Sequence, residues 1–570
     1  MKILALHVDY INFKPLKKAL KSVAELSEKE KKGSEIRDAL AILTSVEKSD
    51  TNIEETAKKL VENIKDIAEK VNATNIVLYP YAHLSSDLAS PENAIKVLEF
   101  AEKELKKNKF TVSKAPFGYY KEFELKVKGH PLSALSRVIS ADKNIAEKPR
   151  QQKEQKIILD RSKLPKNDHR IIGEEMKIFS FSDDVGPGLV LWLPNGEVIR
   201  DQIMRFMRDI ETKQGYQYVT TPHITKGIMY EKTGHVPYYT ESLYSPMKID
   251  NVDYYLKPMN CPHHHMIYKK LVDSYKDLPF KLAEAGTVYR NELSGVTYGL
   301  IRVRGMTQND AHIYVAPNQL KDEFLKVIEM FDKVYKTMGI KDYWFRLSLP
   351  DFKANPEKYT GDPKEWEHAS NEIKKAMKES GKKFVEGVGE AAFYGPKIDI
   401  QIKNTLGKEE SIATSQVDIV VPKRLGVEYV DKDGKKKNPI IIHRSIIGSY
   451  ERFIAYLIEQ TEGRFPTWLA PIQVRVLSFT DRNVDHAKEV IKKLAEQIPE
   501  LRIDADFRNT TMQAKVKDAE IMRIPYIITI GDKEEKEKTL AIRVRGSPKL
   551  QTFKLKEFAE SLEREIKERK

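Results

Sequence analysis

One polar stretch constrains this chain more than any other feature. Residues 146–156 read AEKPRQQKEQK and carry almost no apolar side chain, so they have nothing to bury in a core. We therefore expect a linker at 144–156. The whole chain has 570 residues, too many for one hydrophobic core, and about three domains are expected. The predicted domains are residues 1–143, 157–466 and 467–570.

The first domain mixes strand and helix patterns, which predicts an α/β unit. Short apolar or alternating runs predict strands, and longer charged stretches with helical periodicity predict helices. The predicted strands are 3–8, 75–79 and 122–127. The predicted helical regions are 15–48, 51–71 and 91–107.

The last hundred residues alternate strands and helices regularly, which predicts a compact α/β domain. The predicted strands are 474–479, 502–506, 526–530 and 541–544, and the predicted helices are 483–497, 511–522 and 554–568. The central block lacks that rhythm, although it has alternating strands such as 398–402 and 412–421. The chain contains no GxxxxGK[ST] or GxGxxG pattern, so a nucleotide would have to bind on another scaffold.

Composition narrows the setting in which the protein works. A net charge of +13 and a pI near 9.1 favour a polyanionic partner. Cys261 is the single cysteine, so an intrachain disulfide is impossible and a reducing compartment is expected. The N-terminus has the pattern of a buried strand, and no apolar stretch is long enough to cross a bilayer. We expect a cytoplasmic protein without a membrane partner.

Cys261, His312 and His443 form a candidate metal site. A soft thiolate with two imidazoles is a ligand set that suits zinc, and three protein ligands leave a fourth position open, as in catalytic zinc sites. The three residues are far apart in the sequence, and spacing alone is weak support. His263, His264 and His265 in the same MNCPHHH stretch are competing ligands.

Three arginines form a candidate nucleotide site. Arg290 and Arg302 flank a short loop that could join two antiparallel strands, and Arg452 opens a predicted helix. Arginine suits phosphate oxygens because its planar fork bonds bidentately and keeps its charge. Glu292 can accept a hydrogen bond from an exocyclic amine. The alternative for each arginine is a surface salt bridge.

Residues 216–222, the residues around Arg290 and Arg302, and residues 448–453 resemble the three signature motifs of class II aminoacyl-tRNA synthetases. Longer strings resemble the threonyl-tRNA synthetase family, namely KPMNCP at 257–262, YRNELSG and RVRGMTQNDAHIY within 289–314, FYGPKID at 393–399 and HRSIIGSYERF at 443–453. The resemblance covers about 157–570. It implies a multidomain α+β and α/β protein, with a class II antiparallel-sheet catalytic core and a C-terminal α/β anticodon-binding domain.

The resemblance also assigns roles to residues. It implies one Zn²⁺ per subunit on Cys261, His312 and His443, and catalytic roles for Arg290, Arg302 and Arg452. It implies ATP-binding roles for Arg290, Glu292, Arg302, Met306, Gln416 and Arg452. It implies threonine-binding roles for Met259, Arg290, Gln308, Asp310, Tyr394, Lys397 and Gln416. Family members commonly have phenylalanine, stacked on adenine, where this chain has Met306.

The implied reaction activates L-threonine with ATP and Mg²⁺ and then transfers it to tRNA(Thr). Threonine can give zinc its amino group and its hydroxyl, so valine is rejected by about 10⁴-fold or more. Serine lacks only a methyl group, worth roughly 1–3 kcal/mol, so a second, hydrolytic site is expected. The family is dimeric through its first motif, which makes residues 216–222 the expected homodimer interface.

The N-terminal unit resembles the archaeal editing domain, which is similar to D-aminoacyl-tRNA deacylases. LYPYAHLSS at 78–86, GYYKEFE at 118–124 and GHPLS at 129–133 carry this resemblance. It implies that His83, Tyr120 and Lys121 hold the terminal adenosine and the misattached serine. An acidic residue often follows HPLS in that family, whereas this chain has Ala134.

The last domain resembles the anticodon-binding domain of this class II subgroup, on ADFRN, GDKE and IRVRG. The implied base-reading residues are Asn509, Glu534, Arg543 and Arg545. Two alternatives remain open. One is a class II synthetase for another amino acid, such as proline or serine. The other is a synthetase-like protein that binds RNA for regulation.

Overall fold

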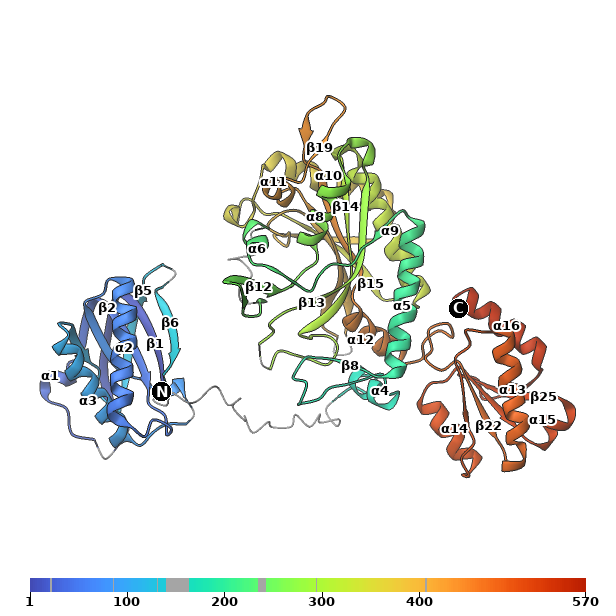
Figure 1. The fold of residues 1–570 in the computed structure, drawn as a ribbon, viewed down its shortest axis with the longest axis horizontal. Coiled ribbons are helices and arrows are strands. Elements are labelled where there is room, and N and C mark those ends of the chain that lie inside the picture. The colour runs from blue at the N-terminus through green and yellow to red at the C-terminus, as the bar shows by residue number, and fades with distance from the viewer. Residues whose placement is uncertain are drawn as a thin grey trace. The chain divides into compact units, whose positions relative to one another are not determined.

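The computed structural model divides into two compact units, residues 1–155 and 156–570 (Figure 1). The linker predicted at 144–156 lies outside the described residues. Within the described part, no helix is both long and apolar enough to cross a membrane. The structure describes residues 1–20, 23–85, 87–130, 132–139, 164–233, 242–293, 295–404 and 407–570.

A curled sheet forms the centre of the first unit. Its described strands are β1 (Lys2–Lys18), β2 (Ser34–Ser45), β3 (Asn75–Pro80), β4 (Thr111–Lys114), β5 (Tyr119–Val127) and β6 (Ala134–Val138). They pair in the order β4-β3-β2-β1-β5, and β6 also pairs with β1. The pairs among β2, β3 and β4 are parallel, and β1 is antiparallel to its partners.

Two amphipathic helices cover one face of this sheet. They are α2, Ile53–Val71, and α3, Pro91–Lys107. The side chains of Asn52 and Ser90 cap their first turns by accepting backbone N–H bonds. Their apolar residues recur every three or four positions and pack against the inward residues of β1, β2 and β3.

On the face opposite the helices, the sheet curls until strands that are not neighbours approach each other. Phe123 on β5 and Tyr79 on β3 have ring centroids 5.4 Å apart, although β1 and β2 separate those strands in the sheet order. The sheet must therefore curl strongly, which leaves a cavity between β5 and the end of β3.

The helical region predicted at 15–48 is wrong. β1 continues to Lys18, and β2 fills residues 34–45, so that among the described residues of this range the one-turn helix α1, Glu28–Lys31, is the only helix. Charged residues with helical spacing suggested a helix, but pairing with β1 and β3 buries the run from Ala39 to Ser45 on both faces. Tertiary burial outweighs local pattern here.

A mostly antiparallel sheet organises the second unit. Its eight described strands follow the order β16-β15-β17-β18-β21-β14-β13-β9. They are β9 (Gln217–Tyr218), β13 (Phe280–Tyr289), β14 (Gly305–Val315), β15 (Tyr343–Leu349), β16 (Phe384–Val388), β17 (Lys397–Lys403), β18 (Glu409–Asp418) and β21 (Ile440–Ser449).

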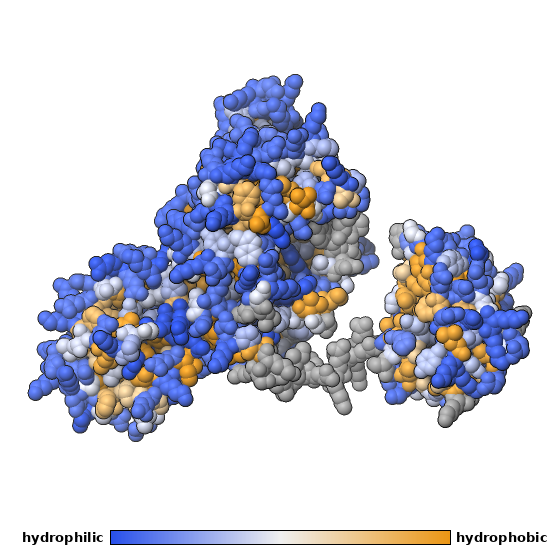
Figure 2. Space-filling view, turned by 180° about the vertical axis from the view of Figure 1, so that it is seen from behind, coloured by the Kyte–Doolittle hydropathy of each residue, from blue (hydrophilic) through white to orange (hydrophobic). Residues whose placement is uncertain are grey.

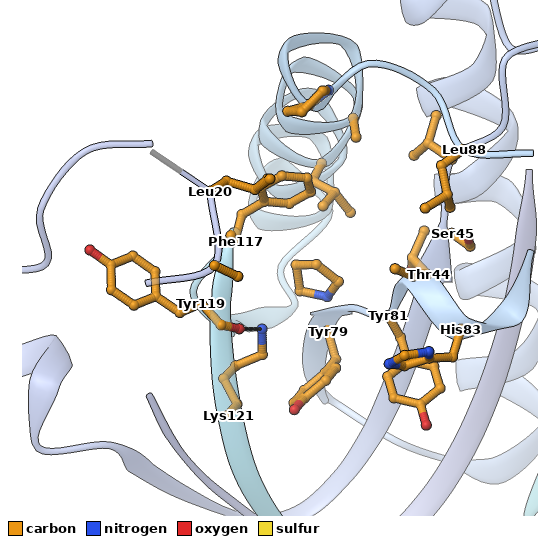
Figure 3. A pocket seen from close by; sticks show the side chains of 18 of the residues that line it. Leu20, Thr44, Ser45, Tyr79, Tyr81, His83, Leu88, Phe117, Tyr119 and Lys121 are labelled. Atoms are coloured by element: carbon orange, nitrogen blue, oxygen red, sulfur yellow. Dashed lines mark hydrogen bonds between the residues drawn. The ribbon is translucent and has the colours of Figure 1, made fainter. Parts of the chain in front are cut away.

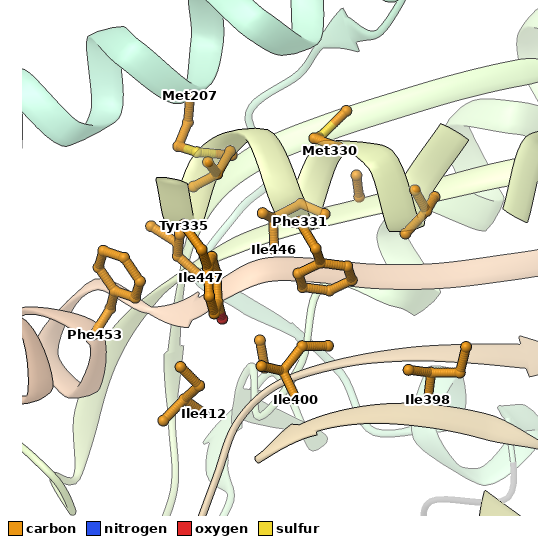
Figure 4. Packing of buried hydrophobic residues seen from close by; sticks show 14 of the residues in the cluster. Met207, Met330, Phe331, Tyr335, Ile398, Ile400, Ile412, Ile446, Ile447 and Phe453 are labelled. Carbon is orange, nitrogen blue, oxygen red and sulfur yellow. The ribbon is translucent and has the colours of Figure 1, made fainter. Parts of the chain in front are cut away.

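Helices bury one face of this sheet. The covering helices include α5 (Pro194–Lys213), α9 (Leu320–Thr337), α10 (Pro363–Glu379) and α12 (Tyr450–Thr461). Phe331 and Tyr335 of α9 lie over Ile400 of β17 in the largest hydrophobic cluster of the described residues (Figure 4). With one face filled in this way, the opposite face is left for polar chemistry.

The last hundred residues form a five-stranded sheet in the described structure, in the order β23-β22-β24-β25-β26. Its elements are β22 (Val474–Ser478), α13 (Val484–Gln497), β23 (Ile503–Asp506), α14 (Met512–Ile521), β24 (Tyr526–Ile530), α15 (Asp532–Glu537), β25 (Thr539–Val544), β26 (Leu550–Lys554) and α16 (Leu555–Lys567). The four predicted strands and three predicted helices are present. β26 and α15 were not predicted.

Hydrophilic side chains cover most of the face that Figure 2 shows. This agrees with a sequence in which charged residues make up 32%.

Candidate active site and metal centre

One row of side chains crosses four neighbouring strands of the eight-stranded sheet. Lys397 on β17 lies opposite Gln416 on β18, and Gln416 lies opposite His443 on β21. His443 in turn lies opposite His312 on β14. Directly opposed residues of antiparallel strands project from the same face. The sheet register therefore brings two predicted metal ligands and two predicted threonine-binding residues onto one surface.

The three predicted zinc ligands converge. Cys261 is the first residue of α8, Cys261–Leu271, which lies beside the row. One ligand atom from each of Cys261, His312 and His443 lies within 4.8 Å of the other two. A tetrahedral zinc ion with bonds of about 2.0–2.3 Å holds its ligand atoms roughly 3–4 Å apart. The donor set and its spacing therefore fit a zinc ion.

A hydrogen-bonded chain fixes the ring of His312 from behind. Its Nδ1 lies 2.8 Å from Nδ1 of His264, and Nε2 of His264 lies 3.2 Å from Glu284 Oε2. The Thr221 N–H donates to Glu284 Oε1 at 2.7 Å. Burial alone raises the pKa of Glu284, but the bonds from His264 and Thr221 outweigh it and lower the pKa to about 2. A carboxylate behind a ligand histidine is the common outer support of zinc sites.

His443 has a comparable support, because its Nε2 lies 3.1 Å from Asp418 Oδ2. Burial raises the pKa of the Cys261 thiol, and the nearby Asp310 carboxylate raises it further. Of the competing histidines, His264 supports His312, and His265 lies with its ring 5.7 Å from that of His312 while its Nδ1 bonds the Tyr314 hydroxyl at 2.9 Å. Neither ring nitrogen of His263 has a hydrogen-bond partner among the described residues.

A cavity of about 360 Å³ opens on the same face of the sheet. It is lined by Arg290, Glu292, Arg302, Met306, Gln308, Asp310, Gln416, His443 and Arg452, together with further residues of β18, of β21 and of the loop before β14. The candidate metal site thus borders the cavity through His443, and the predicted ATP-binding residues all line it.

The charged residues of the cavity already make contacts. Arg302 pairs with Glu292 at 2.9 Å, and its side chain is half exposed. Arg452 Nε donates to the Ile301 carbonyl at 3.0 Å. Arg290 Nε donates to the Pro258 carbonyl at 3.5 Å. Three guanidinium groups around one cavity can hold a polyphosphate, since they stay charged at any physiological pH.

The predicted threonine-binding residues lie nearby. Asp310 accepts a bond from Asn260 Nδ2 at 3.0 Å, and burial raises the pKa of Asp310. The Tyr394 hydroxyl bonds Gln416 Oε1, and the Tyr394 ring lies 5.8 Å from that of His443. The Lys397 ammonium is held by Asp399 at 2.8 Å. Met259 precedes α8 by two positions.

Sequence reasoning missed several residues that organise this site. It treated His264 as a competing ligand and did not connect it with Glu284. It also passed over Glu451, which lies in the first turn of α12 beside Arg452. Glu451 Oε2 accepts the Thr307 N–H at 3.0 Å, and burial raises the pKa of Glu451 to about 7. Only an apolar flank in the sequence hinted that Glu451 is buried.

The first unit has a cavity of its own, of about 510 Å³ (Figure 3). All three residues predicted for editing, His83, Tyr120 and Lys121, line it. The ammonium of Lys121 donates to the carbonyls of Pro116 and Tyr119 at 2.8 and 3.0 Å. It also lies 5.2 Å from the Tyr79 ring centroid. Burial lowers the pKa of Lys121 to about 8.

Ala134, the departure noted in the sequence, lies on β6 opposite Leu6. It is not among the described residues that line this cavity. The side chain at this position therefore has no contact with the cavity in the described structure.

The predicted anticodon residues divide into two pairs. Asn509 follows β23 and Glu534 follows β24, so both lie at the carboxyl edge of the parallel strands. Arg543 lies opposite Ile527, toward the other end of the sheet. Arg545 donates to the backbone carbonyls of Arg523 and Phe465, and burial lowers the pKa of Arg545 to about 10. Its guanidinium is thus engaged inside the protein.

Comparisons with known proteins agree with this geometry. Residues 1–139 match the archaea-specific editing domain of threonyl-tRNA synthetase. Residues 240–461 match the class II tRNA synthetase core domain (G, H, P, S and T), and residues 473–565 match the anticodon-binding domain. The solved RNA-binding domain of threonyl-tRNA synthetase from Cryptosporidium parvum is 32% identical, with a TM-score of 0.64, and the match covers 70% of this chain and 97% of that one.

The chain belongs to the threonyl-tRNA synthetase family. Its predicted fold class is confirmed: a class II core, an N-terminal editing domain and an anticodon-binding domain, built from mixed sheets with helices. Two curated threonine–tRNA ligases, one from Thermus thermophilus and one from Bacillus subtilis, are 45% and 44% identical over 71% and 70% of this chain. The matched part of this chain spans 62% of the length of each of them.

Proposed function

We propose that this chain is a threonine–tRNA ligase that activates threonine with ATP and Mg²⁺, transfers it to tRNA(Thr), and hydrolyses mischarged seryl-tRNA(Thr). One observation carries the proposal: a Cys–His–His ligand set borders a cavity lined by three arginines. A phosphate cavity alone would fit many nucleotide enzymes. A thiolate–imidazole metal site beside it adds a means of selecting a hydroxyl amino acid.

The residues of this chain supply orientation and charge. Arg290 would hold the α-phosphate and the threonine carboxylate so that the carboxylate attacks phosphorus and pyrophosphate leaves. Arg302 and Arg452 would hold the outer phosphates, and Glu292 would accept the adenine amino group. Positioning and charge stabilisation of this kind account for most catalysis of phosphoryl-type displacement. Mg²⁺ would bind with the ATP phosphates.

Zinc on Cys261, His312 and His443 would supply two coordination contacts that select an amino acid with both an amino group and a β-hydroxyl. Asp310 would accept a hydrogen bond from the threonine hydroxyl. A pocket that binds a hydroxyl rejects valine by about 10⁴-fold or more, but it distinguishes serine by only about 1–3 kcal/mol. The imbalance makes an editing site necessary.

The cavity of the first unit is the proposed editing site. Its wall combines the His83 imidazole and the Lys121 ammonium with the rings of Tyr79 and Tyr120. Aromatic surfaces can stack on a terminal adenosine, and a half-buried ammonium can hold an ester carbonyl or phosphate. Arg545 is engaged inside the protein, and Arg543 lies toward the other end of the sheet from Asn509 and Glu534. Of the predicted anticodon residues we therefore assign base reading to Asn509 and Glu534.

We also propose a homodimer that uses residues 216–222. This stretch includes β9, which lies at the edge of the eight-stranded sheet in its described part. A second subunit there would cover that edge.

Exchange of pyrophosphate into ATP, measured with single amino acids, tests the ligase activity. We expect exchange with threonine, weaker exchange with serine and none above background with valine or proline. Absence of exchange with threonine would refute the proposal. Exchange with proline instead would make the chain a synthetase for another amino acid.

Charging of tRNA(Thr) separates the ligase from an RNA-binding regulator. A regulator would bind tRNA without forming threonyl-tRNA. Elemental analysis of the wild type and of Cys261→Ser tests the metal. We expect about one zinc per chain in the wild type and a large loss in the variant.

A further inference from the structure

Two consecutive residues at the start of α4, His169–Glu175, contact three consecutive residues of the loop between β13 and β14. His169 Nε2 accepts the Leu300 N–H at 3.2 Å. The guanidinium of Arg170 lies 4.1 Å from the Tyr298 ring centroid and donates to the Tyr298 hydroxyl at 2.7 Å. Gly299 lies between them, and a Cβ there would come within 2.1 Å of His169 Nε2.

The residues that contact the loop are themselves fixed by buried hydrogen bonds. His169 is fully buried, and its Nδ1 lies 2.7 Å from Glu459 Oε1 on α12. Because the Leu300 N–H must donate to Nε2, the ring proton lies on Nδ1 and donates to Glu459. Asp168 accepts two bonds from the Arg170 guanidinium, at 2.9 and 2.8 Å. Both ring nitrogens of His169 and the Asp168 carboxylate are thereby engaged in hydrogen bonds, whereas Glu459 Oε2 is buried without a hydrogen-bond partner among the described residues.

The clamped segment sets the position of a cavity arginine. Tyr298 and Arg302 exchange backbone hydrogen bonds at 3.0 and 3.2 Å, which closes a turn over residues 298–302. Arg302 is the last residue of this turn and lines the cavity. The Arg452 side chain holds the same turn through the Ile301 carbonyl. A shift of the turn must therefore move Arg302.

We propose that His169 and Arg170 are positioning residues for ATP: they clamp the turn at 298–302 so that the Arg302 guanidinium faces the phosphates. The hydrogen bond from the Leu300 N–H to His169 holds the backbone of the turn, and the stack of Arg170 on Tyr298 holds its first side chain. Glu459 holds the His169 ring in the tautomer that can accept. The inference rests on the proposed function, because it assumes that the cavity binds ATP.

Threonine-dependent exchange of pyrophosphate into ATP tests the clamp in the full chain. In His169→Ala, one backbone hydrogen bond is lost, and the KM for ATP should rise about tenfold. The KM for threonine should change by less than about twofold, since the metal site and Asp310 are untouched. In His169→Gln, an amide can donate to Glu459 and accept from Leu300, so most of the ATP affinity should return.

Two further variants separate positioning from stability. Tyr298→Ala removes an exposed ring and should raise the KM for ATP without lowering the melting temperature. Ile172 is buried on the same helix, where its side chain lies beside Gly463, and it makes none of the hydrogen bonds that hold the turn. Ile172→Ala empties this position. It should lower the melting temperature and leave the KM for ATP unchanged.

The outcomes distinguish the two proposals. A wild type without threonine-dependent exchange refutes the proposed function. An active wild type, with an unchanged KM for ATP in His169→Ala and Tyr298→Ala, refutes the clamp alone. A rise in the KM for ATP that Ile172→Ala reproduces also refutes the clamp.

Discussion

The Nδ1 atoms of His264 and His312 lie 2.8 Å apart, so one of these two nitrogens must donate and the other must accept. The ionised Glu284 determines which of the two nitrogens donates. It accepts from His264 Nε2, so His264 carries its proton there and accepts at Nδ1. His312 must then donate from Nδ1, which leaves the lone pair of its Nε2 for a metal. The buried Glu284 carboxylate thus orients the proton on His264, which in turn orients the proton on His312, the metal ligand.

His264→Ala should therefore weaken zinc binding by about 10–100-fold, because His312 loses the acceptor that fixes its tautomer and ring orientation. Competition with a chromophoric zinc chelator measures the affinity without needing enzyme activity. His263→Ala is the matched control, since it removes a neighbouring imidazole that has no hydrogen bond among the described residues. Equal losses in both variants would mean that α8 is merely destabilised.

Met306→Phe should strengthen ATP binding. Met306 lines the cavity, and the resemblance places this side chain over adenine. A ring in a fixed stack is worth about 0.5–1.5 kcal/mol beyond its area, so the KM for ATP should fall about two- to tenfold. Met306→Leu, which has no ring, should leave the KM near that of the wild type. An unchanged KM in Met306→Phe would place adenine away from this residue.

Lys121→Met should abolish most hydrolysis of seryl-tRNA(Thr) by the full chain, by about 100-fold or more, because a positioned cation is lost. The same change should stabilise the first unit at neutral pH. Burial lowers the pKa of Lys121 to about 8, so the folded state binds fewer protons than the unfolded state between pH 8 and 10.5. The free energy of unfolding of the wild type therefore rises with pH across that window, and the variant should lack this rise.

Lys126→Met is the control for both measurements. Lys126 lies on the same strand, but its side chain is 69% exposed. It should keep normal hydrolysis. Undiminished hydrolysis by Lys121→Met would show that the editing site lies elsewhere.

Local sequence patterns predicted much of the fold. The strands at 474–478 and 526–530 were placed to within a residue, because a short, mostly apolar run between polar or turn residues has a strong local signal. The prediction for residues 15–48 was wrong, because their charges favoured a helix, whereas pairing with distant strands makes most of this range extended. Cross-strand burial of that kind has no local signature.

The site divides in the same way. Cys261, His312 and His443 were found by ligand chemistry and family resemblance, and the structure brings them together. The support of His312 by Glu284 depends on how α8 lies against β13, which no spacing in the sequence encodes. Arg545 looked like a base-reading residue because of its type and motif. Its engagement with two backbone carbonyls became visible only in the folded domain.

Glu451 offers a test of how burial affects stability beside the cavity. Its side chain is almost fully buried, and burial raises its pKa to about 7, whereas an exposed glutamate has a pKa near 4.5. Between these values the folded state binds more protons than the unfolded state. The free energy of unfolding therefore falls as the pH rises through that window, by up to about 3 kcal/mol.

Glu451→Gln should remove this dependence. The amide oxygen can still accept the Thr307 N–H, and no charge needs to be buried at high pH. The variant should melt at a higher temperature than the wild type at pH 8 and at nearly the same temperature at pH 4.5. Melting curves across this pH range measure the difference. A constant offset between the two proteins at every pH would show that Glu451 titrates normally and that only its hydrogen bond matters.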